Sequence, residues 1–337
     1  MGVAIKSISH FVPETRLTNQ ELGARLNMDS DVIGEKTGIF ERRVFHDGAT
    51  SDMIVNAAKI CLEQCGMDVL DVECIIVATM TADFPCPSTA AVVHHKLGTK
   101  NAWGFDAMAA CSGFLYGFEI GSALLNSKQY KNVLLCAADK MTSIIDPMDK
   151  KTSLIFGDGA GVVLLEYTDD EHNEIIDTIC KLDSTDLMSV SASHGGSKNP
   201  MTPQSLEQTD HLMKFTSRGI FSGGIALFKE VILEVMEKNN ISFDDIDYFV
   251  PHQANKRMLE GLAAELNQPI SKFIINIEYI GNTNSGSVPI ALSEAISDGR
   301  IKPGMKIIVA GVGAGFTYGA SIIDIKYPII HSGSIAN

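Results

Sequence analysis

An internal duplication is the feature of this sequence that most constrains its fold. Three short apolar runs in the first half of the chain recur, in the same order, in the second half. Runs of this kind, rich in Ile, Val and Leu, are typical of strands buried on both faces of a sheet. Any α/β protein contains such strands, but the matched order of three pairs favours duplication. The pairs are 74–79 with 248–252, 132–138 with 306–311, and 159–166 with 318–325.

The segments between these runs predict helices, and together they indicate two related α/β halves. Apolar residues at helical spacing indicate one buried helix over 112–125 and another over 255–266. The stretch 183–209 is rich in Ser, Gly, Pro and Thr, so we expect a loop there. We place the two halves at 1–170 and 171–337, joined at a polar stretch.

Composition narrows the class of protein further. The 337-residue chain has a formal net charge of −14, which argues against a nucleic-acid-binding protein. Its seven cysteines are odd in number and several lie in apolar runs, so we expect free thiols in a reducing compartment. The first residues do not resemble a secretion signal, and no apolar run is long enough to cross a membrane. We therefore expect a cytoplasmic protein without a membrane span.

One cysteine differs from the other six in its surroundings. Cys111 follows small residues and directly precedes the predicted helix over 112–125. A thiol at the N-terminus of a helix meets unpaired N–H groups and the positive end of the helix dipole, which lowers its pKa. The same N–H groups can stabilise an oxyanion during attack on a thioester. We therefore predict that Cys111 is a nucleophile and that the other cysteines are core residues.

Two polar residues in the second half complete a candidate site. His252 ends a predicted central strand, which is where open α/β sheets place their ligands, although a lone histidine there could also be a core residue. Asn282 lies in a Gly- and Ser-rich turn, where Ser287 has the place of an N-cap for the following helix. In the duplicated arrangement Asn282 takes the place that Cys111 has in the first half. We therefore expect the thiol and the amide to face each other across a pseudo-twofold axis.

These residues carry a resemblance to a known family that covers essentially the whole chain. The sequence resembles the 3-oxoacyl-[acyl-carrier-protein] synthase III family of the thiolase superfamily. The resemblance implies a duplicated five-layered (αβαβα) thiolase-like α/β fold and a homodimer. The motifs are Thr-Gly-Ile at 37–39 with Glu-Arg at 41–42, Ala-Ala-Cys-Ser-Gly-Phe at 109–114, Gly-Asp-Gly-Ala-Gly at 157–161, Pro-His-Gln-Ala-Asn at 251–255 and Gly-Asn-Thr at 281–283.

The resemblance also implies a role for each site residue. Cys111 would be acylated, and His252 and Asn282 would bind the malonyl thioester oxygen while carbon dioxide leaves. The Cys111 N–H, with the backbone at Ala314 and Gly315, would form an oxyanion hole. The acyl pocket would be lined by Phe84, Cys86, Phe156 and Val312, and the acyl carrier protein would bind near Lys229, Lys256 and Arg257. No metal or prosthetic group is implied, and the last glycine-rich loop lacks the second cysteine of a reversible thiolase.

Four positions depart from the family pattern. Val32 stands where many members have a Trp that stacks on coenzyme A, and Lys36 stands where an Arg is frequent. Cys86 stands where an aromatic residue closes the acyl pocket in many members, although Phe84 could close the pocket in its place. Ala314 replaces a Gly in the last loop. These departures bear on whether the primer is bound to coenzyme A or to the carrier, and on its length.

The sequence thus predicts a condensing acyltransferase that joins an acyl thioester to malonyl-acyl-carrier protein and initiates fatty-acid synthesis. One alternative is a specialised relative that condenses longer acyl groups in secondary metabolism, giving a resorcinol-, cyclohexanedione- or quinolone-type product. Another is acyl transfer from Cys111 without decarboxylation.

Overall fold

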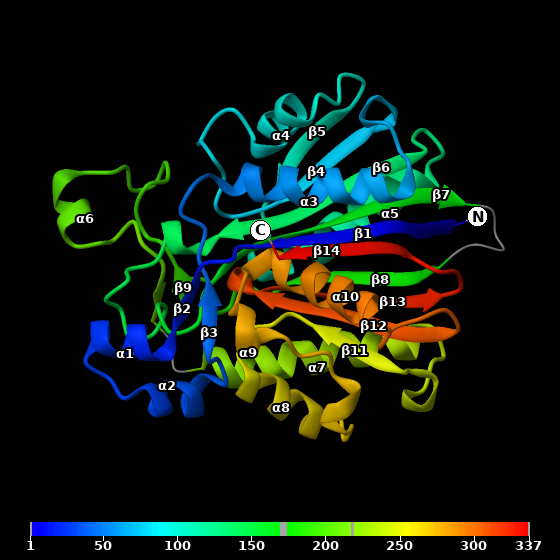
Figure 1. The fold of residues 1–337 in the computed structure, drawn as a ribbon. Helices are drawn as coiled ribbons and strands as arrows, with labels where there is room; N and C mark the ends of the chain where they lie inside the picture. The colour runs from blue at the N-terminus through cyan, green and yellow to red at the C-terminus, as the bar shows by residue number, and fades with distance from the viewer. Residues whose placement is uncertain (1, 169–173, 217–218, 336–337) are drawn as a thin grey trace.

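Two β-sheets form the centre of the structure, a computed structural model that describes residues 2–168, 174–216 and 219–335 (Figure 1). The first sheet has the strand order β14-β1-β7-β6-β4-β5 and the second has the order β11-β12-β13-β8. The strands of the first sheet are β1 (Gly2–Val12), β4 (Cys74–Ala78), β5 (Trp103–Ala107), β6 (Asn132–Lys140), β7 (Asp158–Thr168) and β14 (Ile330–Ile335). Those of the second are β8 (Ile175–Leu182), β11 (Tyr248–Pro251), β12 (Met305–Gly313) and β13 (Thr317–Ile325).

The two sheets repeat one strand arrangement, as the duplication predicted. In the first sheet β4 is parallel to β6, and β6, β7 and β1 follow with antiparallel pairing. In the second sheet β11 is parallel to β12, and β12, β13 and β8 follow with antiparallel pairing. The three predicted pairs of apolar runs are therefore β4 with β11, β6 with β12, and β7 with β13.

The division into halves near residue 170 stays a prediction, because residues 169–173 lie outside the described part of the chain. β14, near the C-terminus, pairs with β1 of the first sheet. The last strand therefore crosses from the second half to the sheet of the first.

Helices lie between the two sheets and on both of their outer faces, which gives five layers (Figure 1). Between the sheets, the central helices pack against apolar strands of both sheets, so most of their residues are buried. The layers contain α3 (Thr50–Cys65) and α4 (Thr89–Leu97) outside the first sheet, α5 (Gly113–Asn126) and α10 (Ser287–Ser297) between the sheets, and α7 (Ile220–Lys238) and α8 (Lys256–Glu265) outside the second. Among the described residues, no helix has both the length and the apolar composition of a membrane span.

Shorter elements surround one end of the layers. The stretch predicted as a loop contains two of them, β9 and α6, and α6 lies at the far left of Figure 1. Its Thr202 N-cap and Pro203 at the first turn form this short helix despite the loop-like composition. The remaining elements are α1 (Asn19–Leu26), α2 (Ser30–Thr37), β2 (Arg16–Thr18), β3 (Glu41–Arg43), β9 (Val190–Ser191), α6 (Pro203–Glu207), β10 (Lys214–Phe215) and α9 (Ile277–Ile280).

The predicted cap of α10 is wrong. Ser287 is the first residue of this helix, its N-cap is Gly286, and no side chain caps it. The hydroxyl of Ser287 lies instead 2.6 Å from the ring of His252.

Candidate active site

Cys111 lies in a 3₁₀ turn, η2 (Ala110–Ser112), that leads directly into α5. Ala110 has a φ of +46°, a left-handed conformation that is uncommon for a residue with a side chain and is frequent near active sites. Two hydrogen bonds fasten the turn to β13. The Ser112 hydroxyl donates to the Thr317 carbonyl at 2.8 Å, and the Thr317 hydroxyl donates to the Ala109 carbonyl at 2.7 Å. The second sheet therefore fixes the backbone on both sides of the thiol.

The acidity predicted for Cys111 is not borne out. Burial raises the pKa of the Cys111 thiol above its ordinary value, and the nearby Asp139 carboxylate acts in the same direction. A backbone hydrogen bond opposes both effects without reversing them. The position before α5 is as predicted, but the desolvation of the thiolate outweighs the favourable helix end.

His252 follows β11 at the edge of the second sheet. Its backbone N–H donates to the Ala310 carbonyl at 2.7 Å, which continues the pairing of β11 with β12 by one residue. Burial lowers the pKa of His252 to about 3, while a backbone contact with Asn284 acts against this shift. The imidazole is therefore neutral at physiological pH and can donate one N–H without carrying a charge.

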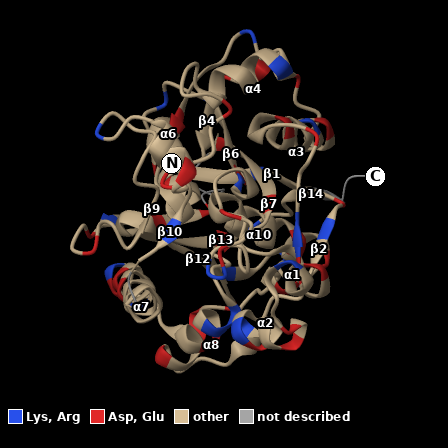
Figure 2. Ribbon diagram, turned by 90° about the vertical axis from the view of Figure 1, so that its left-hand side faces the viewer, with Lys and Arg blue, Asp and Glu red and all other residues tan. Residues whose placement is uncertain are grey.

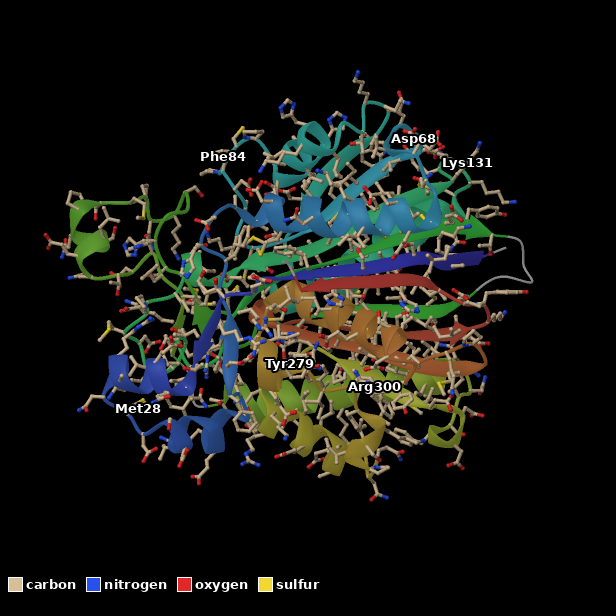
Figure 3. The ribbon with its side chains drawn as sticks, in the orientation of Figure 1. Met28, Asp68, Phe84, Lys131, Tyr279 and Arg300 are labelled. Atoms are coloured by element: carbon tan, nitrogen blue, oxygen red, sulfur yellow. The ribbon has the colours of Figure 1, made fainter. Side chains whose placement is uncertain are left out.

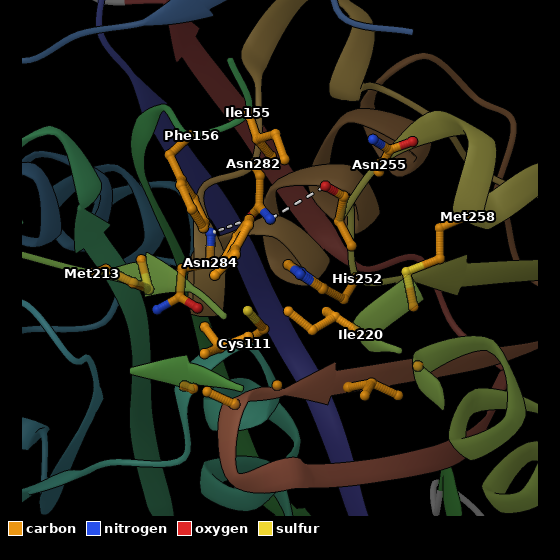
Figure 4. Close-up of a pocket in the computed structure, with 18 of the residues that line it drawn as sticks. Cys111, Ile155, Phe156, Met213, Ile220, His252, Asn255, Met258, Asn282 and Asn284 are labelled. Atoms are coloured by element: carbon orange, nitrogen blue, oxygen red, sulfur yellow. Dashed lines mark hydrogen bonds between the residues drawn. The ribbon is translucent and has the colours of Figure 1, made fainter. Parts of the chain in front are cut away.

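Asn282 lies between α9 and a 3₁₀ turn, η7 (Asn284–Gly286), that leads into α10. Its backbone N–H donates to the Ile155 carbonyl at 2.9 Å, and its carbonyl accepts from the Gly157 N–H at 3.0 Å. Its side-chain Oδ1 accepts from the Asn284 backbone N–H at 2.8 Å, so the amide group is oriented without ambiguity. Among the described residues, the remaining group, Nδ2, makes only a long hydrogen bond of 3.4 Å to the Ala254 carbonyl and is available as a donor (dashed lines in Figure 4).

The thiol, the imidazole and the amide meet in one cavity of about 540 Å³ (Figure 4). Cys111 and Asn282 precede the two helices of the central layer, as the duplication predicted. The rest of the wall is mainly apolar, which suits an acyl chain. It includes Met80, Ile155, Phe156, Val190, Met213, Phe215, Ile220, Phe221, Met258, Val312 and Phe316.

A buried carboxylate supports this arrangement from behind. Oδ2 of Asp139 accepts from Asn284 Nδ2 at 2.8 Å, and from the Ser285 N–H at 3.1 Å and hydroxyl at 2.6 Å. Oδ1 accepts from the Met80 N–H at 2.8 Å. These bonds hold Asn284 in a left-handed conformation, with a φ of +52°, in which its own N–H reaches Asn282. Sequence analysis missed Asp139 and Asn284 because no local pattern links residues so far apart in the chain.

Comparison with known proteins places the chain in a family. Two family models match, the 3-oxoacyl-[acyl-carrier-protein] synthase III model over residues 105–184 and the model of its C-terminal part over 236–325. Among curated relatives, a beta-ketoacyl-[acyl-carrier-protein] synthase III of Koribacter versatilis is 40% identical over 95% of this chain and 96% of its own length. The enzyme of that name from Clostridium perfringens is 36% identical over 94% and 97%. The chain belongs to the 3-oxoacyl-[acyl-carrier-protein] synthase III family.

Solved structures agree with this membership and with the predicted thiolase-like fold. The 3-oxoacyl-[acyl-carrier-protein] synthase III of Aquifex aeolicus matches with a TM-score of 0.88 and 32% identity, over 96% of this chain and 100% of that one. The priming beta-ketosynthase of the R1128 polyketide biosynthetic pathway matches with a TM-score of 0.88 and 28% identity, over 97% of both chains. The chain is thus similar to enzymes named 3-oxoacyl-[acyl-carrier-protein] synthase III and, at lower identity, to one named for a polyketide pathway.

The last glycine-rich loop of this family member packs against the nucleophile. A Cβ on Gly313 would lie 2.7 Å from the Cys111 backbone nitrogen, so only glycine allows this approach. Ala314 lies in the cavity wall, whereas Gly315 does not, although its φ of +130° also favours glycine. An oxyanion hole at this loop stays a prediction.

The four residues predicted for the acyl pocket separate into two pairs. Phe156 and Val312 line the cavity. Phe84 and Cys86 are exposed on the loop before α4, where Phe84 projects from the surface with 54% of its area exposed (Figure 3). The expectation of a core position is therefore wrong for Cys86. Their predicted role depends on a partner subunit, so this single chain does not test it.

The three cations predicted for carrier binding lie on α7 and α8, and each is paired with an acid. Figure 2 shows Lys or Arg positions and Asp or Glu positions close together on the ribbon of α8. The pairs are Lys229 with Glu265 at 2.8 Å, Lys256 with Glu278 at 2.5 Å, and Arg257 with Glu260 at 2.9 Å. Lys256 and Arg257 also line a second hollow beside α1 and α2. In the described part of the chain, no His, Cys, Asp and Glu side chains gather as they would around a metal ion.

Proposed function

We propose that this chain is a condensing enzyme that joins an acyl thioester to malonyl-acyl-carrier protein with loss of carbon dioxide, the reaction that initiates fatty-acid synthesis. One observation carries the proposal: a cysteine thiol, a neutral imidazole and an oriented amide converge in one apolar cavity. Family membership supports the same reaction. A binding protein or scaffold would have no need of this convergence.

In the first half-reaction Cys111 accepts the acyl group. Its Sγ attacks the thioester carbonyl, the carbon–sulfur bond of the incoming thioester breaks, and the departing thiolate takes a proton. Because burial raises the pKa of Cys111, its thiolate forms sparingly. The thiol proton therefore has to leave as the attack proceeds, and the apolar wall then encloses the acyl chain.

In the second half-reaction the malonyl group loses carbon dioxide. The carbon–carbon bond to the carboxylate breaks, and its electron pair forms an enolate whose negative oxygen needs hydrogen-bond donors. Asn282 Nδ2 and one ring N–H of His252 supply two donors without a charge. The carbanion then attacks the acyl-cysteine carbonyl, the bond to Sγ breaks, the released Cys111 thiolate takes up a proton from water, and the 3-oxoacyl thioester leaves.

We further propose that the enzyme works as a homodimer in the cytoplasm. Exposed apolar side chains near β5 support a subunit interface, since Phe84, Trp103 and Met108 are all exposed in the single chain. Cys86 lies on the same loop as Phe84 and would reach the partner's acyl pocket from there.

A specialised relative that condenses longer acyl groups is the second candidate. The wide apolar wall of the cavity and the absence of an aromatic residue at Val32 and Cys86 favour it. Both candidates share the mechanism and differ in the primer.

The test is product formation from malonyl-acyl-carrier protein labelled in its free carboxyl group. Incubation with a panel of acyl thioesters should release labelled carbon dioxide and yield a carrier-bound 3-oxoacyl product, one for each condensed malonyl group. Best turnover with acetyl favours initiation, and best turnover with long chains favours the specialised candidate. Acyl transfer to an alcohol or amine without release of label would contradict both.

A further inference from the structure

Ser287 has no capping role, although it begins helix α10. Its Oγ lies 2.6 Å from Nδ1 of His252, and the two residues are 2% and 1% exposed. The backbone N–H of Gln253 donates to the same oxygen at 3.3 Å. The Ser287 hydroxyl is therefore enclosed between the imidazole of His252 and the backbone N–H of the next residue, Gln253.

The hydrogen-bond capacity of this hydroxyl decides the direction of its bond to His252. A serine hydroxyl has one hydrogen to donate and two lone pairs. The Gln253 N–H occupies one lone pair, and the hydroxyl has no other acceptor than Nδ1 within bonding distance in the described part of the chain. If Nδ1 carried the ring proton, the serine hydrogen would be buried without a partner. That arrangement is disfavoured by roughly tenfold or more, because an unsatisfied buried donor is costly.

We propose that Ser287 is a positioning residue that donates its hydrogen to Nδ1 of His252 and thereby keeps the ring proton on Nε2. Nδ1 is directed at Ser287 and the ring lines the cavity, while the backbone contact with Asn284 favours a proton on the ring without deciding between its two nitrogens. A neutral ring has a single N–H, so the tautomer decides whether His252 can donate to an oxyanion. The inference rests on the proposed function, in which the enolate oxygen requires that donor.

Helix α10 contains a matched control for this contact. Ser293 lies further along the same helix, is fully buried, and has its Oγ 2.9 Å from Nδ1 of another buried histidine, His10. Neither residue lines the cavity. Ser293→Ala therefore removes a hydroxyl–imidazole hydrogen bond of the same kind without touching His252.

The direct experiment is nitrogen NMR of the dimer with ¹⁵N-labelled histidine at neutral pH, with a His252→Asn variant to assign the signal. The Nδ1 and Nε2 shifts of a neutral ring differ according to which nitrogen holds the proton. We expect the Nε2–H tautomer in the wild type, and a shift toward Nδ1–H in Ser287→Ala but not in Ser293→Ala. A wild-type ring protonated at Nδ1 would overturn the proposal, even if Ser287→Ala failed to fold.

Half-reaction rates give the second readout. Ser287→Ala should acylate Cys111 at the wild-type rate and lose malonyl decarboxylation by about 10- to 100-fold, whereas Ser293→Ala should keep both. Equal loss of both half-reactions in Ser287→Ala would indicate a purely structural role and contradict the proposal. Failure of the proposed function can be distinguished from failure of this inference. A wild-type protein that never decarboxylates a malonyl thioester would contradict the proposed function, but its nitrogen shifts would still show which nitrogen of His252 holds the proton.

Discussion

Asn282→Asp is a sharp perturbation of the proposed donor pair because it keeps the shape of the side chain. One carboxylate oxygen can retain the bond that Oδ1 now accepts from the Asn284 N–H at 2.8 Å. The other replaces Nδ2, whose only hydrogen bond to the described residues is the long one to the Ala254 carbonyl. The backbone bonds of Asn282 to Ile155 and Gly157 do not depend on its side chain. The substitution therefore changes a donor into an acceptor and leaves its surroundings in place.

The size of the expected loss in decarboxylation rate follows from the hydrogen-bond donor that the enolate oxygen loses. Removal of one oxyanion donor costs about 10²–10³ in rate, and Asn282→Ala should show this loss of decarboxylation. In Asn282→Asp a negative oxygen would also face the enolate inside a cavity that excludes water, so we expect a loss beyond about 10³. Acylation of Cys111 should change little in either variant, because it does not use this donor.

The assay measures carbon dioxide release from a malonyl thioester beside the mass of the acyl-enzyme. Decarboxylation by Asn282→Asp within about tenfold of wild type would refute the donor role, since a missing donor alone costs more. Faster decarboxylation by Asn282→Asp than by Asn282→Ala would also contradict it. Loss of acylation in both variants would instead indicate that Asn282 supports the loop.

Other consequences can be measured separately. Because burial raises the pKa of Cys111, its alkylation by iodoacetamide should rise about tenfold per pH unit from pH 7 to 9, and a plateau below pH 8 would contradict this. Burial lowers the pKa of His10 from 6.5 to about 4, so its neutral form stabilises the fold above pH 6.5, and this contribution is lost as the pH falls toward 4. Denaturant unfolding should show the wild type losing stability relative to His10→Asn over that range by up to about 1.4 kcal/mol per pH unit, and a constant difference would exclude it. Lys229→Glu combined with Arg257→Glu should weaken carrier-dependent turnover and remove its salt sensitivity, and an unchanged salt series would exclude this docking site. Cys86→Phe should shift loading toward acetyl, since each excluded methylene is worth about 0.8 kcal/mol, and an unchanged chain-length profile would remove Cys86 from the pocket.

Much of the fold could be predicted from the sequence because buried strands have a strong local signal. The runs that became β4, β6 and β7 are almost wholly apolar, and so are their counterparts in the second sheet. β14 was not predicted, because nothing in the sequence of 330–335 indicates that it pairs with β1. Helix α6 was also missed, since its start depends on one capping threonine and one proline in an otherwise loop-like stretch.

The site was predictable in its reacting residues and less so in their support. Cys111, His252 and Asn282 each belong to a recognisable motif, and the structure brings them to one cavity. The direction of the pKa shift of the Cys111 thiol was predicted wrongly, because burial depends on the tertiary structure and its effect outweighs that of the helix N-terminus. Ser287 was predicted to be an N-cap because the sequence shows only that it lies beside the start of a helix. Its contact with His252, which is 35 residues away in the chain, depends on the tertiary structure.

Mass spectrometry of the acyl-enzyme tests the central claim most directly. The wild-type protein is mixed with an acyl thioester, its intact mass is measured, and the added group is located by peptide mapping, with Cys111→Ala treated in parallel. We expect one acyl group on Cys111 of the wild type, its loss when malonyl-acyl-carrier protein is added, and no acylation of the variant. Acylation that persists in Cys111→Ala, or an acyl group that malonyl-acyl-carrier protein cannot discharge from the wild type, would contradict it.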